Sequence, residues 1–398
     1  MRFRTAGTSG ILLLSLVGCA AGGAEPPPEA PTGTGHGEIE GAHELAEPAL
    51  HLTTVDAAGT VHHLDLLDEE TSVLAEIEPI DDLVTDGRYL FGIRSGSVTV
   101  IDSGVWTWSH IDHFHYYEAP SRVIGDIEGA GVATVVPGET GTGIHFDDEA
   151  VLLDTLALAD GEIVEEFRIP ASSPEGLLVP LAEGAVVTEP DAADGGALRI
   201  IAQDGAPGET VPCMNAVGTI TTVVGVVIGC DDGAALAVGG DPNEWEQISY
   251  PADHAAPTAT DFAARRGRPG VSALAGDEGV WMLDTRGRTW SFQSIGEEII
   301  QVAAVDDEAE RVLALAADGS VLVLAGGEIV ARTAPLVAAS LADPDVADRV
   351  ELVVDQHRAY LNGPVENMMW EIDPADDARI ARVFEAATSP LHLAGTGR

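Results

Sequence analysis

The sequence contains no lysine, so all 19 basic residues are arginines, set against 66 aspartates and glutamates, and the formal net charge is −47. Residues 1–18 hold two arginines and no acid, so the chain without them has a net charge of −49. Binding nucleic acid requires basic side chains that neutralise phosphates, and this charge argues against such a partner. The same negative field raises the local concentration of cations, which favours capture of a divalent metal.

Long hydrophobic runs are also missing, so we expect no transmembrane helix. The N-terminus has Arg2 and Arg4, then the short apolar run 11–17, and then Leu16-Val17-Gly18-Cys19. This pattern is typical of a secretory signal that ends in a lipobox. We therefore expect residues 1–18 to be a lipoprotein signal peptide, and Cys19 to be lipidated and to anchor the protein outside the cytoplasm on a bacterial cell membrane. The alternative is an ordinary secreted protein with a chance cysteine at that position.

Cysteine is scarce: besides Cys19 the chain has only Cys213 and Cys230. These two flank a segment, 220–228, that is predicted to form two strands with a turn near Gly225. Outside the cytoplasm such a pair is expected to form a disulfide, which contributes about 3 kcal/mol for a loop of this length. The alternative, a pair of thiolate metal ligands, lacks any CxxC spacing.

Aromatic residues make up only 5% of the chain, which is rich instead in small and aliphatic residues and in glycine. Residues 19–48 are dominated by Pro, Gly, Ala, Thr and Glu, a composition that cannot bury a core, and we expect a disordered acidic tether. The remaining residues, 49–398, are predicted to form one all-β domain of many short strands.

A repeated pattern in this domain indicates a β-propeller. An apolar strand, a turn rich in Gly and Asp, and a second apolar strand recur eight times, at intervals of roughly 37 to 53 residues. We expect eight four-stranded blades, with seven as the alternative. The first hairpin lacks an inner strand and residues 390–394 lack a hairpin, so we predict that the C-terminal strand completes the first blade and closes the ring.

The motifs of common enzymes are absent from the sequence. It has no Gly-x-Ser-x-Gly, no His-Glu-x-x-His and no calcium loop of the Asp-x-Asp-x-Asp-Gly type. Residues 284–290 are faintly similar to the aspartate box of sialidase-type propellers, but the segment occurs once and with the wrong spacing. We expect a protein that is not an enzyme.

The stretch Asp112-His113-Phe114-His115-Tyr116-Tyr117 is predicted to be a metal site. In a strand, residues i and i+2 point to the same side, so His113 and His115 supply two of the four ligands of a tetrahedral zinc site. The candidates for further ligands are His110, Asp112 and His145. The stretch lies in an insertion from about residue 103 to 120 of the second blade. The alternative is an aromatic plug, with Trp106 and Trp108, that packs over the core.

A second group of candidate ligands lies in the tether. His36, Glu38 and His43 belong to an acidic segment just before the propeller, and on a mobile arm they are candidates for loose metal capture. A solvated linker is the alternative.

Taken together, several features resemble the AztD-type zinc metallochaperones: the His-Phe-His-Tyr-Tyr run, the histidine-containing acidic arm after a lipobox, Val179-Pro180-Leu181, and the two cysteines 213 and 230. The resemblance covers most of the chain after about residue 36. It implies an extracytoplasmic, monomeric β-propeller that binds zinc through His113 and His115. It also implies that the protein passes the ion to the solute-binding protein of an ABC zinc importer.

The sequence departs from that family at two places. The family pattern has histidines just before the stretch that matches Val179-Pro180-Leu181 and shortly after the first cysteine, where this chain reads Ser172-Ser173-Pro174-Glu175 and Met214-Asn215-Ala216-Val217. The alternative function is therefore a non-enzymatic interaction scaffold on the cell surface whose metal site has decayed.

Overall fold

The structure, a computed structural model, describes residues 39, 41–110, 113–171, 176–189, 196–277 and 279–398. These residues belong to one compact unit. The predicted signal peptide, the lipidation site Cys19, and the candidate ligands His36, Glu38 and Asp112 lie outside the described residues.

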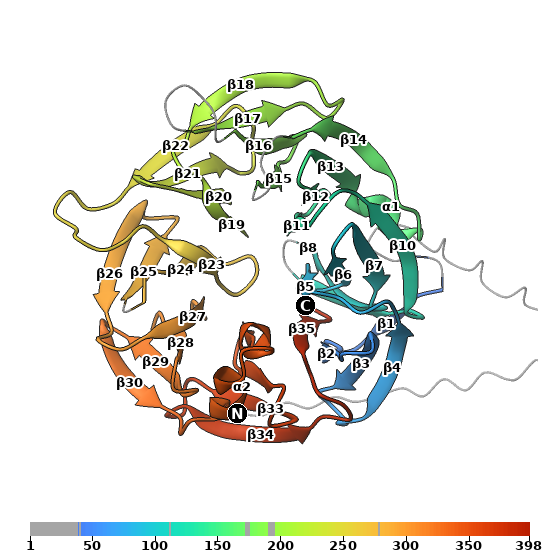
Figure 1. The fold of residues 1–398 in the computed structure, drawn as a ribbon, viewed down its shortest axis with the longest axis vertical. Coiled ribbons are helices and arrows are strands. Elements are labelled where there is room, and N and C mark those ends of the chain that lie inside the picture. Colours follow the sequence, from blue (N-terminus) through green and yellow to red (C-terminus); the bar gives the residue numbers. More distant parts are fainter. Residues whose placement is uncertain (1–38, 40, 111–112, 172–175, 190–195, 278) are drawn as a thin grey trace, which may run out of the picture. The chain divides into compact units, whose positions relative to one another are not determined.

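Eight four-stranded antiparallel sheets form the ring of blades seen in Figure 1. From its inner to its outer strand, blade 1 has β35 (His392–Thr396), β2 (His51–Val55), β3 (Thr60–Asp65) and β4 (Thr71–Glu76). In the same order, blade 2 has β5 (Asp82–Thr85), β6 (Tyr89–Arg94), β7 (Ser97–Asp102) and β10 (Arg122–Glu128). Blade 3 has β11 (Thr134–Pro137), β12 (Gly141–His145), β13 (Glu149–Asp154) and β14 (Glu165–Pro170). Blade 4 has β15 (Leu178–Pro180), β16 (Ala185–Glu189), β17 (Ala197–Ile201) and β18 (Pro207–Pro212).

The second half of the ring repeats this arrangement. Blade 5 has β19 (Val217–Thr222), β20 (Gly225–Cys230), β21 (Gly233–Val238) and β22 (Trp245–Ser249). Blade 6 has β23 (Thr260–Ala263), β24 (Gly270–Leu274), β25 (Gly279–Asp284) and β26 (Thr289–Ser294). Blade 7 has β27 (Ile299–Ala304), β28 (Val312–Ala316), β29 (Val321–Ala325) and β30 (Glu328–Arg332). Blade 8 has β31 (Leu352–Val354), β32 (Ala359–Gly363), β33 (Met368–Asp373) and β34 (Arg379–Glu385).

The predictions of an all-β propeller, of eight blades and of the closing strand are confirmed. β35 pairs with β2 from His51 opposite Thr396 to Val55 opposite His392, so both ends of the domain share blade 1. Two side-chain contacts to the Thr396 hydroxyl reinforce this pairing: the Thr53 hydroxyl lies 3.1 Å away and His63 Nε2 2.9 Å away. Because the ring is closed, the inner strand of blade 1 leaves no sheet edge unpaired at the seam.

Apolar side chains between neighbouring blades form the core. One cluster joins Phe91 and Val100 of blade 2 to Ile144, Phe146 and Val151 of blade 3. The second strands β12, β20, β28 and β32 are buried along their whole length, whereas the outer strand β18 is almost fully exposed. Burial on both faces explains why these second strands consist mostly of small and aliphatic residues. At β12 the blades approach closely, since a Cβ on Gly143 would lie 1.9 Å from the Leu178 carbonyl oxygen.

Helices are short and lie in the connections. α1 (Thr155–Ala159) follows β13 and is capped by the Asp154 carboxylate, which accepts hydrogen bonds from the backbone of residues 156 and 157. α2 (Ala338–Ala342) and a 3₁₀ turn (Ala347–Arg349) connect blades 7 and 8. Within the described residues no helix has the length and apolar character needed to cross a membrane.

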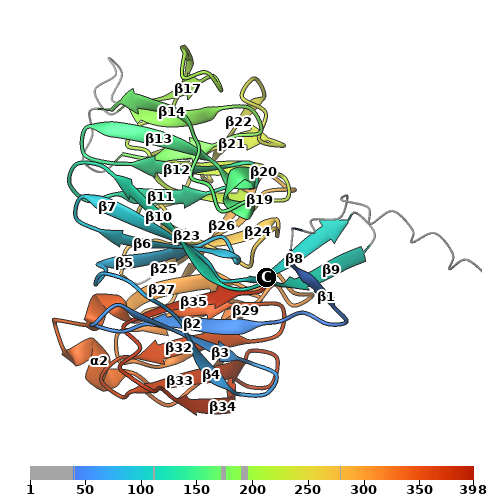
Figure 2. The same cartoon turned by 90° about the vertical axis from the view of Figure 1, so that its right-hand side faces the viewer.

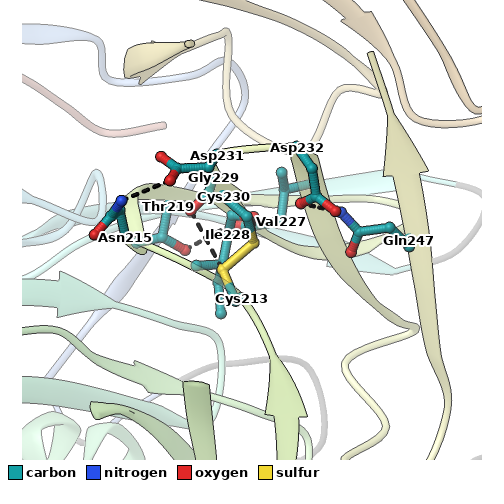
Figure 3. Close-up of a disulfide and its surroundings, with 10 residues drawn as sticks. All are labelled: Cys213, Asn215, Thr219, Val227, Ile228, Gly229, Cys230, Asp231, Asp232 and Gln247. Carbon is teal, nitrogen blue, oxygen red and sulfur yellow. Dashed lines mark hydrogen bonds between the residues drawn. A yellow bond between two sulfur atoms is a disulfide. The ribbon is translucent and has the colours of Figure 1, made fainter. Parts of the chain in front are cut away.

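The predicted disulfide between Cys213 and Cys230 is confirmed. Cys213 precedes β19 and Cys230 ends β20, and their Cα atoms are 5.2 Å apart (Figure 3). Both cysteines are buried in the cluster that joins blades 4 and 5. The bond therefore links the entry into blade 5 to its second strand.

Candidate metal centre

A β-hairpin carries the predicted metal-binding stretch. β8 (Val105–His110) and β9 (His113–Glu118) are inserted between β7 and β10 of blade 2, as predicted. They pair from Val105 opposite Glu118 to His110 opposite His113. A third strand, β1 (His43–Leu45), adds to β9. Figure 2 shows this three-stranded sheet extending away from one face of the ring.

The strand β1 corrects one prediction. The composition predicts that residues 43–45 belong to the disordered tether, but they pair with Tyr116, Tyr117 and Glu118. Their partner lies more than seventy residues away in the sequence, and the pairing satisfies backbone groups that would otherwise need water. The ordered domain therefore begins before residue 49.

The base of the hairpin is packed against the ring. Trp106 and Tyr117 are nearly fully buried and stack with ring centroids 5.2 Å apart. The Arg88 guanidinium lies 3.9 Å from the Trp106 ring, and it donates two hydrogen bonds, of 3.0 and 2.8 Å, to the buried carboxylate of Asp102. Cation–π contact and a bidentate ion pair together fix the orientation of the hairpin where it leaves blade 2.

The two histidines of the motif lie on one face of the hairpin, as predicted. His113 Nε2 and His115 Nε2 are 2.9 Å apart, and the two rings meet edge to face with centroids 4.7 Å apart. The His115 ring also stacks on Tyr117, at 6.2 Å between centroids. The pair is thus joined through Tyr117 to the buried base.

The spacing of the two nitrogens fits a metal ion. Two imidazole nitrogens on a tetrahedral zinc, each about 2.0–2.1 Å from the ion, are about 3.3 Å apart. The observed separation of 2.9 Å requires only a small movement of either ring. The pair therefore supplies two convergent nitrogen ligands.

Glu44 of β1 is the residue that sequence reasoning missed. Its Oε1 atom accepts a hydrogen bond of 2.6 Å from Nδ1 of His115, and its backbone lies opposite Tyr117. A carboxylate only accepts, so Nδ1 of His115 carries the proton and Nε2 of the neutral ring presents its lone pair toward His113. Carboxylates commonly hold metal-binding histidines in this way.

The predicted capture role of His43 is not supported by the register. His43 lies opposite Glu118, which alternates to the other side of β9 from His113 and His115. The arm thus brings a carboxylate to the pair, while its histidine is directed to the opposite face. Residues 43–45 read His-Glu-Leu, which has no polar–apolar alternation, so the sequence carries no local signal for this strand.

The remaining candidate ligands have separate outcomes. His110 pairs with His113 in the backbone ladder, but its side chain lies outside the described part of the structure. His145 is 1% exposed in β12, and its ring is so close to Gly176 that a Cβ there would lie 2.3 Å from Nε2. Burial lowers the pKa of His145 and keeps its ring neutral. The prediction that His145 completes the site is wrong, because its ring is enclosed in blade 3.

Within the described ranges no group of three or more His, Cys, Asp or Glu side chains is arranged to hold a metal ion. The centre defined by these residues is therefore a pair of convergent imidazoles with one supporting carboxylate. Such a centre leaves coordination positions that another donor can fill.

Comparison with known proteins identifies the fold. No protein-family profile and no curated protein sequence matches the chain. Two structures of AztD from Citrobacter koseri are similar to it, one of them of the apo protein: they are 17% and 18% identical, with TM-scores of 0.72 and 0.73. Each comparison covers 88% of this chain and 98% of AztD.

An enzyme shares the fold more distantly. Dihydro-heme d1 dehydrogenase NirN is 14% identical, with a TM-score of 0.59 over 89% of this chain and 76% of that protein. The architecture alone consequently does not decide between a binding protein and an enzyme. The chain has an AztD-type β-propeller fold.

Proposed function

We propose that the protein binds zinc outside the cytoplasm and delivers it to the solute-binding protein of an ABC zinc importer. The observation that carries the proposal is the meeting of His113 Nε2 and His115 Nε2, 2.9 Å apart, with Glu44 on Nδ1 of His115. The AztD-type fold and the resemblance to zinc metallochaperones support the same assignment. Anchoring through Cys19 would keep the protein at the membrane that contains the importer.

The arrangement suits transfer better than permanent storage. Structural zinc sites are closed by four protein ligands, whereas the described residues supply two imidazoles. A ligand from a partner can therefore enter before the histidines leave, and the ion moves by exchange of ligands. The hairpin extends from the ring face, so a partner can approach it without displacing a blade (Figure 2).

Each residue has a distinct part in this scheme. His113 and His115 donate lone pairs to the ion, and Glu44 holds the proton on Nδ1 of His115 so that Nε2 stays available. In the metal-free state the hydrogen bond between the two rings is donated by His113 Nε2. Binding therefore requires this proton to move to Nδ1 of His113 or to leave, because Nε2 must offer its lone pair to the ion.

The test uses the mature chain with its N-terminal arm, because β1 supplies Glu44. Zinc stoichiometry and affinity are measured against a competing chelator for the wild type, for His113→Ala/His115→Ala, and for the control His254→Ala, which lies in the connection between blades 5 and 6. We expect one tightly bound zinc, lost in the double variant and retained in the control. Loaded protein should then transfer zinc to the solute-binding protein. Unchanged affinity in the double variant would disprove the assignment of the site.

A second candidate function is an interaction scaffold without metal transfer. It is favoured by the lack, among the described residues, of a third metal ligand beside the histidine pair. Met214 and Asn215 occupy one of the places where the family has a histidine, and the Asn215 amide donates to Asp231 instead. Recovery of cell-envelope proteins in a pull-down, with no zinc bound and no importer component recovered, would support this alternative.

A further inference from the structure

One cavity on the ring gathers several arginines, and two of them have no carboxylate partner among the described residues. It has a volume of about 850 Å³ and lies between loops of blades 6, 7 and 8. Its walls include four arginines and five acidic residues: Arg265, Arg268, Arg286 and Arg358, with Asp306, Asp307, Glu308, Glu310 and Asp373. Four of the chain's 19 arginines therefore lie around this one cavity, so the pairing of each with the carboxylates decides whether a guanidinium is left for a ligand.

Two of these arginines have no carboxylate partner among the described residues. Every other described arginine except Arg266 has a carboxylate oxygen within 4.0 Å. Arg266 instead donates to the backbone carbonyl oxygens of residues 86 and 398. Arg265 and Arg286, both of which line the cavity, make no side-chain hydrogen bond or ion pair within the described ranges. In so acidic a protein, unpaired arginines at one place require an explanation.

The carboxylates nearest Arg265 are already engaged. Those that act on it belong to Asp306, Asp355 and Asp307, which pair with Arg268, Arg398 and Arg311 respectively. Arg265 is half-buried, and its pKa is lowered first by burial and then by the charge of Arg268. Within the described part of the chain, Arg265 thus has no carboxylate of its own within hydrogen-bond distance, and its half-buried guanidinium is placed to pair with an anion that enters the cavity.

We propose that this cavity binds a small anion that carries carboxylate or phosphate groups, held by Arg265 and Arg286. Guanidinium groups recognise both kinds of anion through paired N–H donors. The volume lies within the range of small-molecule sites and exceeds what a single inorganic ion needs. Of the five carboxylates in the lining, Asp306, Asp307 and Asp373 are paired with Arg268, Arg311 and Arg358. The other two, Glu308 and Glu310, are exposed on the loop between β27 and β28.

The position of the cavity relates it to the hairpin. Its loops join inner strands to second strands and third strands to outer strands, for example β23 to β24 and β33 to β34. The hairpin is itself the connection from the third to the outer strand of blade 2, and in antiparallel blades these connections emerge on one face. The cavity and the histidine pair thus share a face, but they have no residue in common, so the two proposals can fail separately.

The test measures anion binding to the metal-free mature protein at 150 mM salt. Calorimetric titrations use citrate, succinate and inorganic phosphate, with glycerol as the neutral probe. The variant Arg265→Gln/Arg286→Gln is compared with Arg168→Gln/Arg199→Gln, which removes the same charge from paired surface arginines of blades 3 and 4. If the double variant does not fold, the single variant Arg286→Gln replaces it in the comparison, because Arg286 is exposed.

We expect one molecule of at least one anion to bind per chain. Its affinity should fall about tenfold or more in the cavity variants and stay within about twofold of the wild type in the control. Preference for citrate or succinate would identify a carboxylate ligand, and preference for phosphate a phosphorylated one. Absence of binding by all three anions, or an equal loss in the control, would overturn the proposal. Neither result would bear on zinc binding.

Discussion

Among the described residues, two imidazole rings lie together at two points, and the geometry of the two pairs differs. In the hairpin, His113 and His115 meet edge to face and direct Nε2 toward Nε2. In blade 1, His51 and His63 stack face to face with centroids 4.0 Å apart. The blade pair uses its nitrogens on the protein: His51 Nδ1 donates to the Ala49 carbonyl, and His63 Nε2 bonds the Thr396 hydroxyl.

This difference indicates what makes a histidine pair a candidate ligand set. Proximity of the rings alone is not sufficient, because stacked rings direct their nitrogens apart. The i, i+2 spacing on a paired strand and an added carboxylate turn the hairpin nitrogens toward one point. The stacked pair instead stabilises the seam where β35 closes the ring. The hairpin pair should therefore determine zinc binding, and the blade pair stability.

The largest expected effect comes from removing the blade pair. We expect His51→Ala/His63→Ala to lower the free energy of unfolding by about 3–5 kcal/mol, because it opens a cavity at the seam and breaks the bond to Thr396. Zinc affinity of the folded protein should stay within about twofold of the wild type. Denaturant unfolding and a zinc titration on the same sample give both values. A loss of zinc affinity in this variant would contradict the division between the pairs.

Acid should destabilise the seam through His63. Burial, with a smaller contribution from the charge of His51, lowers the pKa of His63 to about 3 in the folded state, against 6.5 for an unperturbed ring. The unfolded chain therefore binds a proton that the folded chain excludes. The stability from this residue is fully present above pH 6.5 and is lost progressively toward pH 3. The loss in the free energy of unfolding reaches roughly 2–3 kcal/mol at pH 4.5.

The variant His63→Gln isolates this contribution, because it keeps a neutral polar group near Thr396. Unfolding free energies between pH 7.5 and 4.5 should fall less steeply for the variant than for the wild type. The buried His145 and His392, whose pKa values are also lowered by burial, remain in both proteins. Identical slopes would show that His63 does not titrate as the structure requires.

A smaller effect is expected from the carboxylate that supports the hairpin pair. Glu44→Gln keeps the side-chain shape but replaces a charged acceptor by a neutral amide. Zinc affinity should fall about 10- to 100-fold, with little change in stability, since the carboxylate is more than half exposed. Glu47→Gln, two positions beyond β1, is the matched control. An unchanged affinity in Glu44→Gln would mean that Glu44 does not orient His115.

The smallest effect should come from His43. Because its register places it on the opposite face of the hairpin sheet, His43→Ala should change zinc affinity by less than about twofold. The same titration checks this value beside Glu44→Gln. A loss comparable to that of Glu44→Gln would restore His43 to the site and would mean that β1 can shift its register by one residue.

The sequence predicted features that depend on local patterns. Repeated apolar hairpins indicated eight blades, the unpaired first and last segments indicated the closing strand, and the spacing of His113 and His115 placed them on one face. Each inference uses residues a few positions apart or a repeat along the chain. The Cys213–Cys230 disulfide could be predicted from the two cysteines and an oxidising compartment alone.

The features that were missed depend on contacts between distant segments. Glu44 reaches His115 only because a three-residue strand pairs with β9, and nothing near Glu44 in the sequence specifies that partner. His145 ends the short strand Gly141–His145, but its enclosure depends on the packing of its ring against Gly176, which lies just before the first strand of blade 4. The burial of His145 and the hydrogen bond from His115 to Glu44 both depend on tertiary structure, which a local residue pattern does not encode.

The most direct measurement is anomalous diffraction at the zinc edge from crystals of the mature protein grown with one equivalent of zinc. We expect a single ion about 2.0–2.1 Å from Nε2 of both His113 and His115, with Glu44 still on Nδ1 of His115. No ion is expected at His51 and His63. An ion bound elsewhere, or an empty hairpin in protein that carries one zinc, would contradict the central claim.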